Sequence, residues 1–408
     1  MLGGSWLLLT ALLFLASLLL HQVTLLLVGL LFFLAGGIAR LWDRYCLSRV
    51  EYRRRLSSNC VFFGEEVQLE TEVTNRKPLP LPWVQIDDEI PEEVSLLKGK
   101  ALPSYKTARL LLTNLLPLSW YHRVKRRYHL RCLQRGYFAF GPARISSGDL
   151  FGFFRREMET KEVDYLMVYP RILPLEKLGI PSKQLCGNIR IKNNIFPDPV
   201  LTLGVREYHY GDSLKRIHWK AAARTGQLQT KVFEPTTTVD MGIFLDVRTA
   251  ELAYWGSVAQ LLELGIITAA SVSNQALEAG YRVGLYVNQN RWFSHEMVRL
   301  APSRHPDQFR HILETLAQIY PFESMSMDKL LLNEGRDLHW GSTLVVITAI
   351  PTDALIGALS GMRRAGRRVA LILIGGMEAP LSQDGLTVYH VRDDVPWRDI
   401  ETLHVEGQ

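Results

Sequence analysis

The sequence predicts a multidomain chain: an N-terminal transmembrane helical hairpin, an immunoglobulin-like β-sandwich and a C-terminal doubly wound α/β domain. Three observations support this prediction. Residues 1–39 contain no Asp, Glu, Lys or Arg. Residues 45–170 consist of short alternating runs separated by turn residues. Residues 237–408 alternate apolar runs with stretches of helical period. A connector, residues 171–236, lies between the two folded regions.

The transmembrane anchor, residues 1–40, is long enough for two membrane spans. A helix needs about 20 residues to cross a hydrocarbon core about 30 Å thick. We expect one helix near residues 2–20 and a second near 23–39, with the polar pair His21-Gln22 at the turn. One long tilted helix is the alternative. A cleaved signal peptide fits poorly, because no basic residue precedes the apolar run and no small-residue cleavage site closes it.

A cluster of basic residues after the anchor sets the expected orientation of the chain. It consists of Arg40, Arg44, Arg49, Arg53, Arg54 and Arg55. The turn between the two helices offers only His21. Because basic residues accumulate on the cytoplasmic side of a membrane, everything after the anchor should be cytoplasmic. The sequence thus predicts a multi-pass protein of the cell membrane, with its arginine cluster near anionic lipid headgroups.

Composition restricts the function classes. Charged residues make up 22% and hydrophobic residues 47% of the chain, so the soluble part should fold. The four cysteines form no C-x-x-C pair, so free thiols in a reducing compartment are expected, with neither zinc nor disulfides. Residues 122–131 mix bases and aromatics. Because the net charge of +6 is spread over several sites, a charged strand edge is favoured there over nucleic-acid binding.

Turn residues divide the β-rich region into strands at sandwich-like spacing. The expected strands are Glu66–Thr74, Trp83–Asp87, Leu110–Thr113, Arg127–Leu133, Tyr137–Phe140, Ala143–Ser146 and Val163–Tyr169. In the first of them, apolar residues alternate with mostly acidic ones, which is typical of a half-buried strand. No amphipathic helix of usual length intervenes. We therefore predict an immunoglobulin-like sandwich over residues 45–170.

The densest block of the connector is residues 204–226, G-V-R-E-Y-H-Y-G-D-S-L-K-R-I-H-W-K-A-A-A-R-T-G. Gly211 should form a turn, and Asp212 or Ser213 should cap a helix that starts directly afterwards. Gly226 should end that helix. Three apolar residues at helical spacing should face a core: Leu214, Ile217 and Ala221. A strand over Leu228–Phe233 should lead towards the α/β domain.

Two interpretations compete for the charges of this block. In the first, they form a clamp across a domain junction and expose a partner-docking face. In the second, Glu207, Asp212 and His218 form an acid/base site. The first is favoured, because charge networks are as often structural as functional, and a histidine beside Trp219 fits packing better than ligation. The residues expected to carry it are Arg206, Glu207, Tyr208, Gly211, Asp212, Lys215, Arg216, Trp219, Lys220 and Arg224. No catalytic residue is assigned.

From residue 237 onward, apolar strands alternate with helices. The expected strands are Val239–Asp246, Arg282–Val287, Thr343–Thr348, Val369–Ile374 and Leu386–Val391. The expected helices are Leu252–Ala279, Pro306–Ile319 and Thr352–Ala365. Helical crossovers between apolar strands indicate a mostly parallel sheet covered on both faces.

The first strand of this sheet ends at Asp246, where it resembles the von Willebrand factor A fold. That resemblance implies a metal site made of D-x-S-x-S, a later Thr and a second Asp. Here Arg248 and Ala250 replace the two serines, and Ala349 stands where the second Asp would be. With one firm oxygen ligand left, this remnant should bind no metal, and Asp246 and Arg248 could pair locally instead. No P-loop, dinucleotide fingerprint or G-x-S-x-G elbow is present, so no cofactor is expected.

The run R-E-Y-x-x-G-D-x-x-K-R-I-x-W-K-A-x-A-R-T-G resembles the signature of the bacterial domain-of-unknown-function 58 family. Similar landmarks lie upstream: Arg135-Gly136-Tyr137, Gly141-Pro142, Gly148-Asp149-Leu150-Phe151-Gly152 and Val168-Tyr169-Pro170. Many relatives have Pro where Leu150 stands. The resemblance implies a membrane anchor, a β-rich segment and a von Willebrand factor A-like domain. It also implies association with MoxR-type AAA+ ATPases, and often with transglutaminase-like membrane proteins, but no catalytic residue.

We therefore expect a non-enzymatic, membrane-anchored interaction or scaffold protein that docks a cytoplasmic MoxR-type AAA+ ATPase. One alternative is a metal-dependent binding module of the von Willebrand A type. Another is an enzyme centred on Glu207, Asp212 and His218. The sequence leaves the oligomeric state open.

Overall fold

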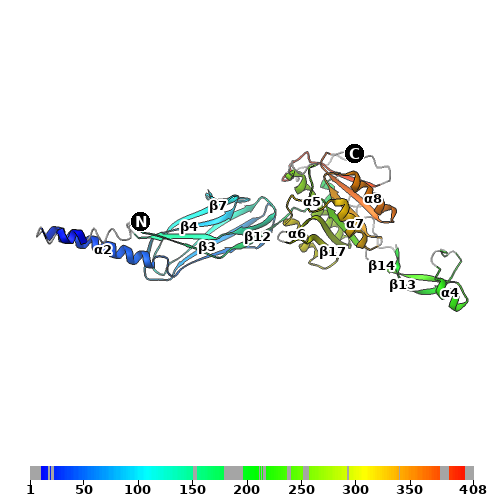
Figure 1. Cartoon of the computed structure of the whole chain (residues 1–408), viewed down its shortest axis with the longest axis horizontal. Helices are drawn as coiled ribbons and strands as arrows, with labels where there is room; N and C mark the ends of the chain where they lie inside the picture. Colours follow the sequence, from blue (N-terminus) through cyan, green and yellow to red (C-terminus); the bar gives the residue numbers. More distant parts are fainter. Residues whose placement is uncertain are drawn as a thin grey trace. The chain divides into compact units, whose positions relative to one another are not determined.

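The computed structural model divides into two compact units, residues 1–169 and residues 170–408 (Figure 1). The structure describes residues 11–16, 19, 23–149, 154–178, 196–210, 212, 214, 217–236, 240–250, 257–291, 294–339, 341–376 and 386–399.

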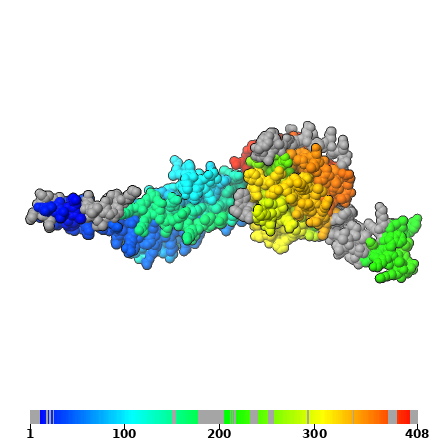
Figure 2. Space-filling view, in the orientation of Figure 1, coloured from blue at the N-terminus to red at the C-terminus, as the bar shows by residue number. Residues whose placement is uncertain are grey.

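Helix α2 (Val23–Tyr45) is, within the described residues, the one helix long and apolar enough to cross a membrane. Its apolar side chains are exposed, Leu31 by 65% and Leu34 by 55%. Figure 2 draws this helix in blue. Such a helix near the N-terminus is a membrane span or a signal sequence. The helix α2 is longer than the predicted second span. Trp42, and Cys46 just after the helix, pack into the core of the β-rich unit, and this packing holds the last turns of α2.

Most of the first helix of the predicted hairpin, residues 2–20, lies outside the described residues. Residues 11–16 are helical. A Cβ added at Gly29 would lie 3.4 Å from the Cβ of Leu13, so this short segment packs against α2. The contact does not make the pair two membrane spans, which stays a prediction.

The β-rich unit contains three sheets. The first has the order β1 (Val50–Leu56), β3 (Glu66–Asn75), β8 (Arg123–Cys132), β5 (Val94–Leu96). The second has the order β11 (Arg155–Glu159), β10 (Ala143–Gly148), β4 (Leu81–Pro91), β7 (Arg109–Leu118), β6 (Leu102–Pro103). The third has β12 (Asp164–Tyr169) between β2 (Cys60–Phe62) and β9 (Gly136–Phe140). Every predicted strand of this region overlaps one of these.

Strand β1 contradicts one expectation. Arg53, Arg54 and Arg55 lie in this strand rather than in a juxtamembrane segment, and Arg54 is only 8% exposed. Its guanidinium forms two hydrogen bonds with the carboxylate of Asp88 in β4. It also donates to the carbonyl of Phe140 in β9 (2.6 Å) and to Asp164 in β12 (3.1 Å). Because these partners belong to the second and third sheets, this arginine joins all three sheets and cannot contact lipid headgroups.

The basic residues of β8 are paired across the sheet. Lys125 contacts Glu70 (3.0 Å) and Glu72 (3.1 Å), and Arg127 contacts Glu70 (2.9 Å). Strand β5 pairs only with residues 130–132 of β8, so the basic half of β8 forms a strand edge among the described strands. Charges on such an edge discourage pairing with another chain.

The α/β unit is built on a six-stranded sheet. Its order is β17 (Met297–Ser303), β16 (Arg282–Asn290), β15 (Asp240–Leu245), β18 (Thr343–Thr348), β19 (Arg368–Ile374), β20 (Thr387–Val391). All neighbouring strands are parallel except β17, which is antiparallel to β16. Helices α5 (Ala259–Glu278) and α6 (Gln308–Ala317) pack together on one face, and α7 (Met327–Asp337) and α8 (Asp353–Arg364) on the other. The prediction of a mostly parallel, doubly covered sheet therefore matches the arrangement.

Among the six strands of this sheet and the four helices that cover it, β17 and α7 were not predicted. Strand β17 is a short edge strand that contains Pro302, which removes a backbone donor and weakens the strand signal. Helix α7 carries a glycine and several charges, so its apolar residues are few. Helix α5 also begins later than the predicted Leu252, since Val258 is extended and precedes its first turn.

Removing the guanidinium that joins the three sheets should destabilise the β-rich unit strongly. We expect Arg54→Ala to lower its free energy of unfolding by about 3–5 kcal/mol, because Asp88 would keep a buried, unpaired charge. Thermal unfolding followed by circular dichroism measures the change. The matched control is Arg53→Ala in the same strand, whose side chain is 55% exposed, so it should change little. Equal effects of both variants would contradict the role of the buried pair.

Candidate functional sites

The signature block forms the closed end of a β-hairpin. Strands β13 (Phe196–Glu207) and β14 (Gln229–Thr236) pair antiparallel, with Arg206 opposite Thr230. The short helix α4 (Trp219–Thr225) belongs to the segment that connects these two strands and lies at the closed end of the hairpin (Figure 1). We call residues 196–236 the arm.

Helix α4 begins five residues later than predicted. Ile217, which is 4% exposed, forms a β-bridge with Thr230, and this extended conformation excludes a helix starting at Leu214. The cap is His218 rather than Asp212 or Ser213: its Nδ1 accepts from the Ala221 N–H at 3.0 Å. His218 Nε2 therefore carries the proton, and this histidine has a structural role.

The predicted end of the helix is confirmed. Gly226 has a left-handed backbone (φ 73°) and its N–H donates to the carbonyl of Ala222. The predicted apolar stripe is only partly formed, because Leu214 is 67% exposed whereas Ile217 is buried. Of these two described apolar residues, only Ile217 contributes to a core.

Asp212 is held by three donors within the arm. It accepts from the Arg206 guanidinium (2.7 Å), the His209 N–H (3.0 Å) and the Thr230 hydroxyl (3.3 Å). The hydrogen bond from Arg206 is the main reason why the pKa of Asp212 falls to about 2. A carboxylate with so low a pKa is a poor general base at neutral pH. The ion pair acts as a clamp inside the arm; a clamp across a domain junction stays a prediction.

Other members of the block contribute backbone contacts or lie outside the described residues. The exposed Glu207 accepts from Arg206 through its backbone carbonyl (3.0 Å). Tyr208, which is half-buried, donates its N–H to the carbonyl of Leu228 (2.9 Å). The members that the structure does not describe are Gly211, Ser213, Lys215 and Arg216.

The arm exposes apolar and cationic side chains together. Trp219 is 68% and Leu214 67% exposed, and Tyr210 is fully exposed. Lys220 and Arg224 are exposed one helical turn apart, and within the described residues neither has an ion-pair partner. We call these five residues the arm tip surface. Grouped exposed apolar side chains typically mark an interaction site.

A second site lies at the carboxyl end of β15, where Asp246 is buried. Its Oδ1 accepts from the Asn288 amide (2.7 Å) and the Arg248 N–H (3.0 Å), and its Oδ2 from the Thr348 hydroxyl (2.9 Å). Asn288 also accepts from the Val247 N–H (2.9 Å). Asn288 was not among the predicted site residues, although an amide within the largely apolar strand β16 was a sequence signal for this site. Strands β15, β16 and β18 thus meet at one carboxylate.

The replaced residues of the metal-site remnant lie close to this carboxylate in the chain. Arg248 contacts Asp246 through its backbone N–H, and its side chain donates to the carbonyl of Ala250 (3.2 Å), so the expected side-chain pair is not formed. Ala349 is 5% exposed directly after β18. Among the described residues, no group of three or more His, Cys, Asp or Glu is placed to hold a metal ion.

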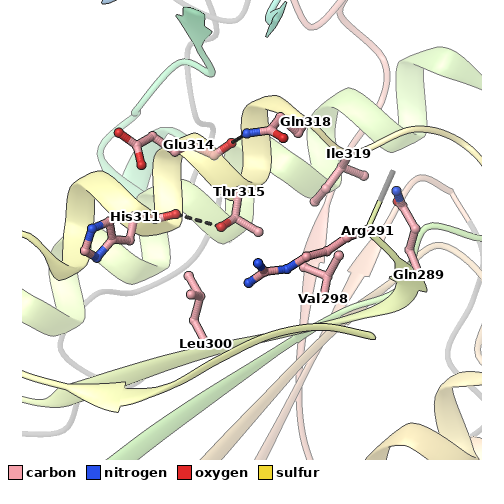
Figure 3. A pocket seen from close by; sticks show the side chains of 9 residues that line it. All are labelled: Gln289, Arg291, Val298, Leu300, His311, Glu314, Thr315, Gln318 and Ile319. Atoms are coloured by element: carbon pink, nitrogen blue, oxygen red, sulfur yellow. Dashed lines mark hydrogen bonds between the residues drawn. The ribbon is translucent and has the colours of Figure 1, made fainter. Parts of the chain in front are cut away.

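A groove of about 410 Å³ lies between α6 and the β16–β17 edge (Figure 3). It is lined by Gln289, Arg291, Val298, Leu300, His311, Glu314, Thr315, Gln318 and Ile319, none of which the sequence singled out. Arg291 points into it, whereas Glu314 points away (Figure 3). The Thr315 hydroxyl donates to the carbonyl of His311, so the lining shows no hydrogen-bonded nucleophile and base.

Comparison with known protein families shows which family the chain is related to. The family model described as "Protein of unknown function DUF58" matches residues 204–394, which include the block at the end of the arm and most of the α/β unit. Residues 204–394 belong to the DUF58 family. The resemblance based on the block is thereby confirmed.

Relatives of this DUF58 chain extend the likeness. The uncharacterized protein YeaD of Bacillus subtilis strain 168 is 23% identical over 359 residues, covering 86% of this chain and 82% of YeaD. The CARDB domain of the PF1109 protein of Pyrococcus furiosus covers 29% of this chain and 89% of its own, at 12% identity and a TM-score of 0.19. A cohesin module of Clostridium perfringens covers 29% of this chain and 96% of its own length, at 9% sequence identity and a TM-score of 0.21. Scores this low do not establish a common fold.

The buried Asp246 should make the stability of this DUF58 chain depend on pH. Burial raises its pKa to about 6. The stability linked to its protonation is therefore fully present below about pH 4, the unfolded value, and is lost as the pH rises through 6. The neutral variant Asp246→Asn should gain stability relative to the natural chain across this window, by about 3 kcal/mol in total.

Melting temperatures of both chains between pH 4.5 and 7.5 measure this difference. Asp353→Asn, at an exposed carboxylate with no ion-pair partner among the described residues, serves as the control and should show a small offset at every pH. A constant offset for Asp246→Asn as well would refute the assignment.

The same site should be indifferent to Mg²⁺. Both oxygens of Asp246 already accept hydrogen bonds from the protein, and the oxygen ligands that a hard cation needs are replaced by Arg248 and Ala250. We expect no rise in melting temperature with millimolar Mg²⁺, since only a ligand of the native state would produce one. A saturable rise that Asp246→Ala abolishes would overturn this prediction.

Proposed function

We propose that this DUF58 chain is a non-enzymatic, membrane-anchored interaction protein that docks a cytoplasmic protein partner through the arm tip surface. The observation that carries the proposal is the joint exposure of Trp219, Leu214 and Tyr210 beside two cations, Lys220 and Arg224. Exposed tryptophan and tyrosine are the residue types that contribute most to the binding energy of protein interfaces.

The charge of the surface restricts the partner. The carboxylate of Asp212 is paired with Arg206, whereas Lys220 and Arg224 have no ion-pair partner among the described residues. The complementary partner is therefore a protein with an apolar pocket surrounded by acidic side chains. A MoxR-type AAA+ ATPase is the partner that the family resemblance implies, with a transglutaminase-like membrane protein as a second member of the assembly.

The finer fold assignments belong to the same proposal. An immunoglobulin-like sandwich is supported by the strands of residues 50–169, which are antiparallel except for the pair β2–β12, and by the two cores among them. A von Willebrand factor A-like domain is supported by the parallel sheet with one antiparallel edge and by Asp246 at the end of its first strand. Such a domain with a degenerate metal site would serve as a scaffold.

The membrane anchor in this proposal is α2. Its surface is apolar, and it ends in a segment rich in arginine, which favours a cytoplasmic location for all that follows. The enzymatic alternative receives less support, because Asp212 and His218 are both engaged in structural hydrogen bonds.

Docking is tested by capture of a purified MoxR-type AAA+ ATPase from the same organism. Trp219→Ser should weaken binding by about tenfold or more, the usual loss at an interfacial hot spot. Lys220→Glu should slow association, and the loss should shrink as salt rises, because such charges act mainly on the encounter rate. Neither change should lower the melting temperature, since both side chains are exposed.

Two matched controls lie on the β-rich unit. Tyr105→Ser removes an aromatic residue that is 73% exposed, and Lys100→Glu reverses an exposed charge. Both should leave capture unchanged. The docking proposal fails if Trp219→Ser and Lys220→Glu bind the ATPase as tightly as these controls at low salt.

The orientation is tested with fusion reporters. A reporter after Gln408 should be active only if it works in the cytoplasm, because the arginines that follow α2 hold this side inside. A reporter at residue 1 separates one span from two: a hairpin places it in the cytoplasm, and a single span places it outside. Activity of an exterior-specific reporter after Gln408 would contradict the proposed topology.

A further inference from the structure

Three loops of the β-rich unit are tied together beside the end of α2. The Lys77 ammonium donates to the carbonyls of Cys46 (2.6 Å) and Ser48 (2.9 Å), directly after the helix. The Tyr121 N–H donates to the carbonyl of Lys77 (3.3 Å), and the Arg76 N–H to that of Arg49 (3.0 Å). Residues 46–49, 75–77 and 119–122 therefore form one face, which we call the anchor face.

The helix enters this face without a flexible linker. Trp42 and Cys46 pack into the core of the β-rich unit, and Asp43 pairs with Arg156 of β11 at 3.3 Å. Counted from Val23 at about 1.5 Å per residue, a hydrocarbon core about 30 Å thick ends close to Trp42. A membrane spanned by α2 would thus have its headgroups at the level where the anchor face begins.

The anchor face presents two adjacent exposed aromatic residues. Trp120 is 66% and Tyr121 69% exposed in the turn between β7 and β8. Tyr121 has a positive φ of 50°, a conformation that non-glycine residues seldom adopt. Trp and Tyr are the residue types enriched at membrane–water interfaces, where an apolar ring with a polar group fits best.

The charge of this face is also suited to lipid. Arg49 of this face and Arg44, in the last turn of α2 beside it, are exposed, and in the part of the chain that the structure describes neither has an ion-pair partner. Arg76 and Arg53 share the single carboxylate of Glu51, at 2.9 and 3.7 Å. The face therefore carries excess positive charge, which anionic headgroups would neutralise.

We propose that the anchor face is a lipid-contact surface, with Trp120 and Tyr121 at headgroup level and Arg44, Arg49 and Arg76 against anionic phosphates. The β-rich unit would then rest on the bilayer in one fixed orientation. This inference rests on the proposed role of α2 as a membrane span.

The test uses the full chain in nanodiscs of phosphatidylcholine and phosphatidylglycerol, about 3:1, in which anionic lipid attracts basic residues. Cys60 and Cys186 are changed to Ser, and an environment-sensitive fluorophore is attached at Ser119→Cys, next to the two aromatic residues. The matched control is Thr107→Cys, an exposed turn residue at the opposite end of β7. A third site, Leu31→Cys on the exposed surface of α2, reports on the anchor itself.

Lipids with a nitroxide on the headgroup should quench the probe at 119 about twofold more than the probe at 107, because the interface holds the aromatic turn. Quenching at 119 should fall in the double variant Trp120→Ser/Tyr121→Ser and in discs of phosphatidylcholine alone. The inference is overturned if the probes at 119 and 107 are quenched equally while nitroxides on the acyl chains quench position 31. If position 31 is not quenched, the membrane anchor of the proposed function fails, and the lipid-contact surface fails with it.

Discussion

The guanidinium of Arg54 is the point at which the three sheets of the β-rich unit meet. Strand β1 supplies it, and its acceptors come from β4, β9 and β12. The hydroxyl of Tyr52 donates to the same carboxylate of Asp88 (2.7 Å), so two residues of one strand face one acid. A buried ion pair of this kind fixes the relative positions of its elements even where its net contribution to stability is small, because breaking it leaves a charge in the core. Strand β1 directly follows residues 46–49 of the anchor face, so the end of α2 and the buried pair are connected through one strand.

Three aspartates show how environment separates structural from chemical roles in this chain. Asp88 is paired with a buried arginine, and Asp212 is paired with Arg206 at the surface, where its pKa is about 2. Asp246 is buried among neutral donors, and its pKa rises to about 6. Each carboxylate is therefore used to hold backbone or strands together. The hydroxyls that contact them, of Tyr52, Thr230 and Thr348, donate to the carboxylates in hydrogen bonds that join strands or loops. The proposed function therefore rests on surface features.

The arm tip surface and the anchor face have the same composition, exposed Trp and Tyr beside cations, but different settings. The arm is a two-stranded hairpin in which, among the side chains that the structure describes, Ile217 is the one well-buried apolar residue, so the exposed side chains at its tip can be altered without disturbing it. The anchor face is built on loops of the β-rich unit that are tied to the end of an apolar helix. The two proposals therefore assign them different partners: a protein for the hairpin tip, which can enter a pocket, and lipid for the anchor face, which would lie at headgroup level if α2 spans the membrane.

The sequence by itself determined the apolar helix, most strands of both units, and the block that marks the family. Thr343–Thr348 was predicted to the residue, because a strand buried on both faces must be a continuous apolar run. Only the tertiary structure decided that Arg54 is buried and paired, because its partner Asp88 lies 34 residues away in the chain. It likewise decided the start of α4, since Ile217 pairs with Thr230 of β14, and the donors to Asp246, which come from β16 and β18. The periodicity of apolar residues shows which side of a segment faces solvent. The partner of a buried charge depends instead on which distant segment folds against it.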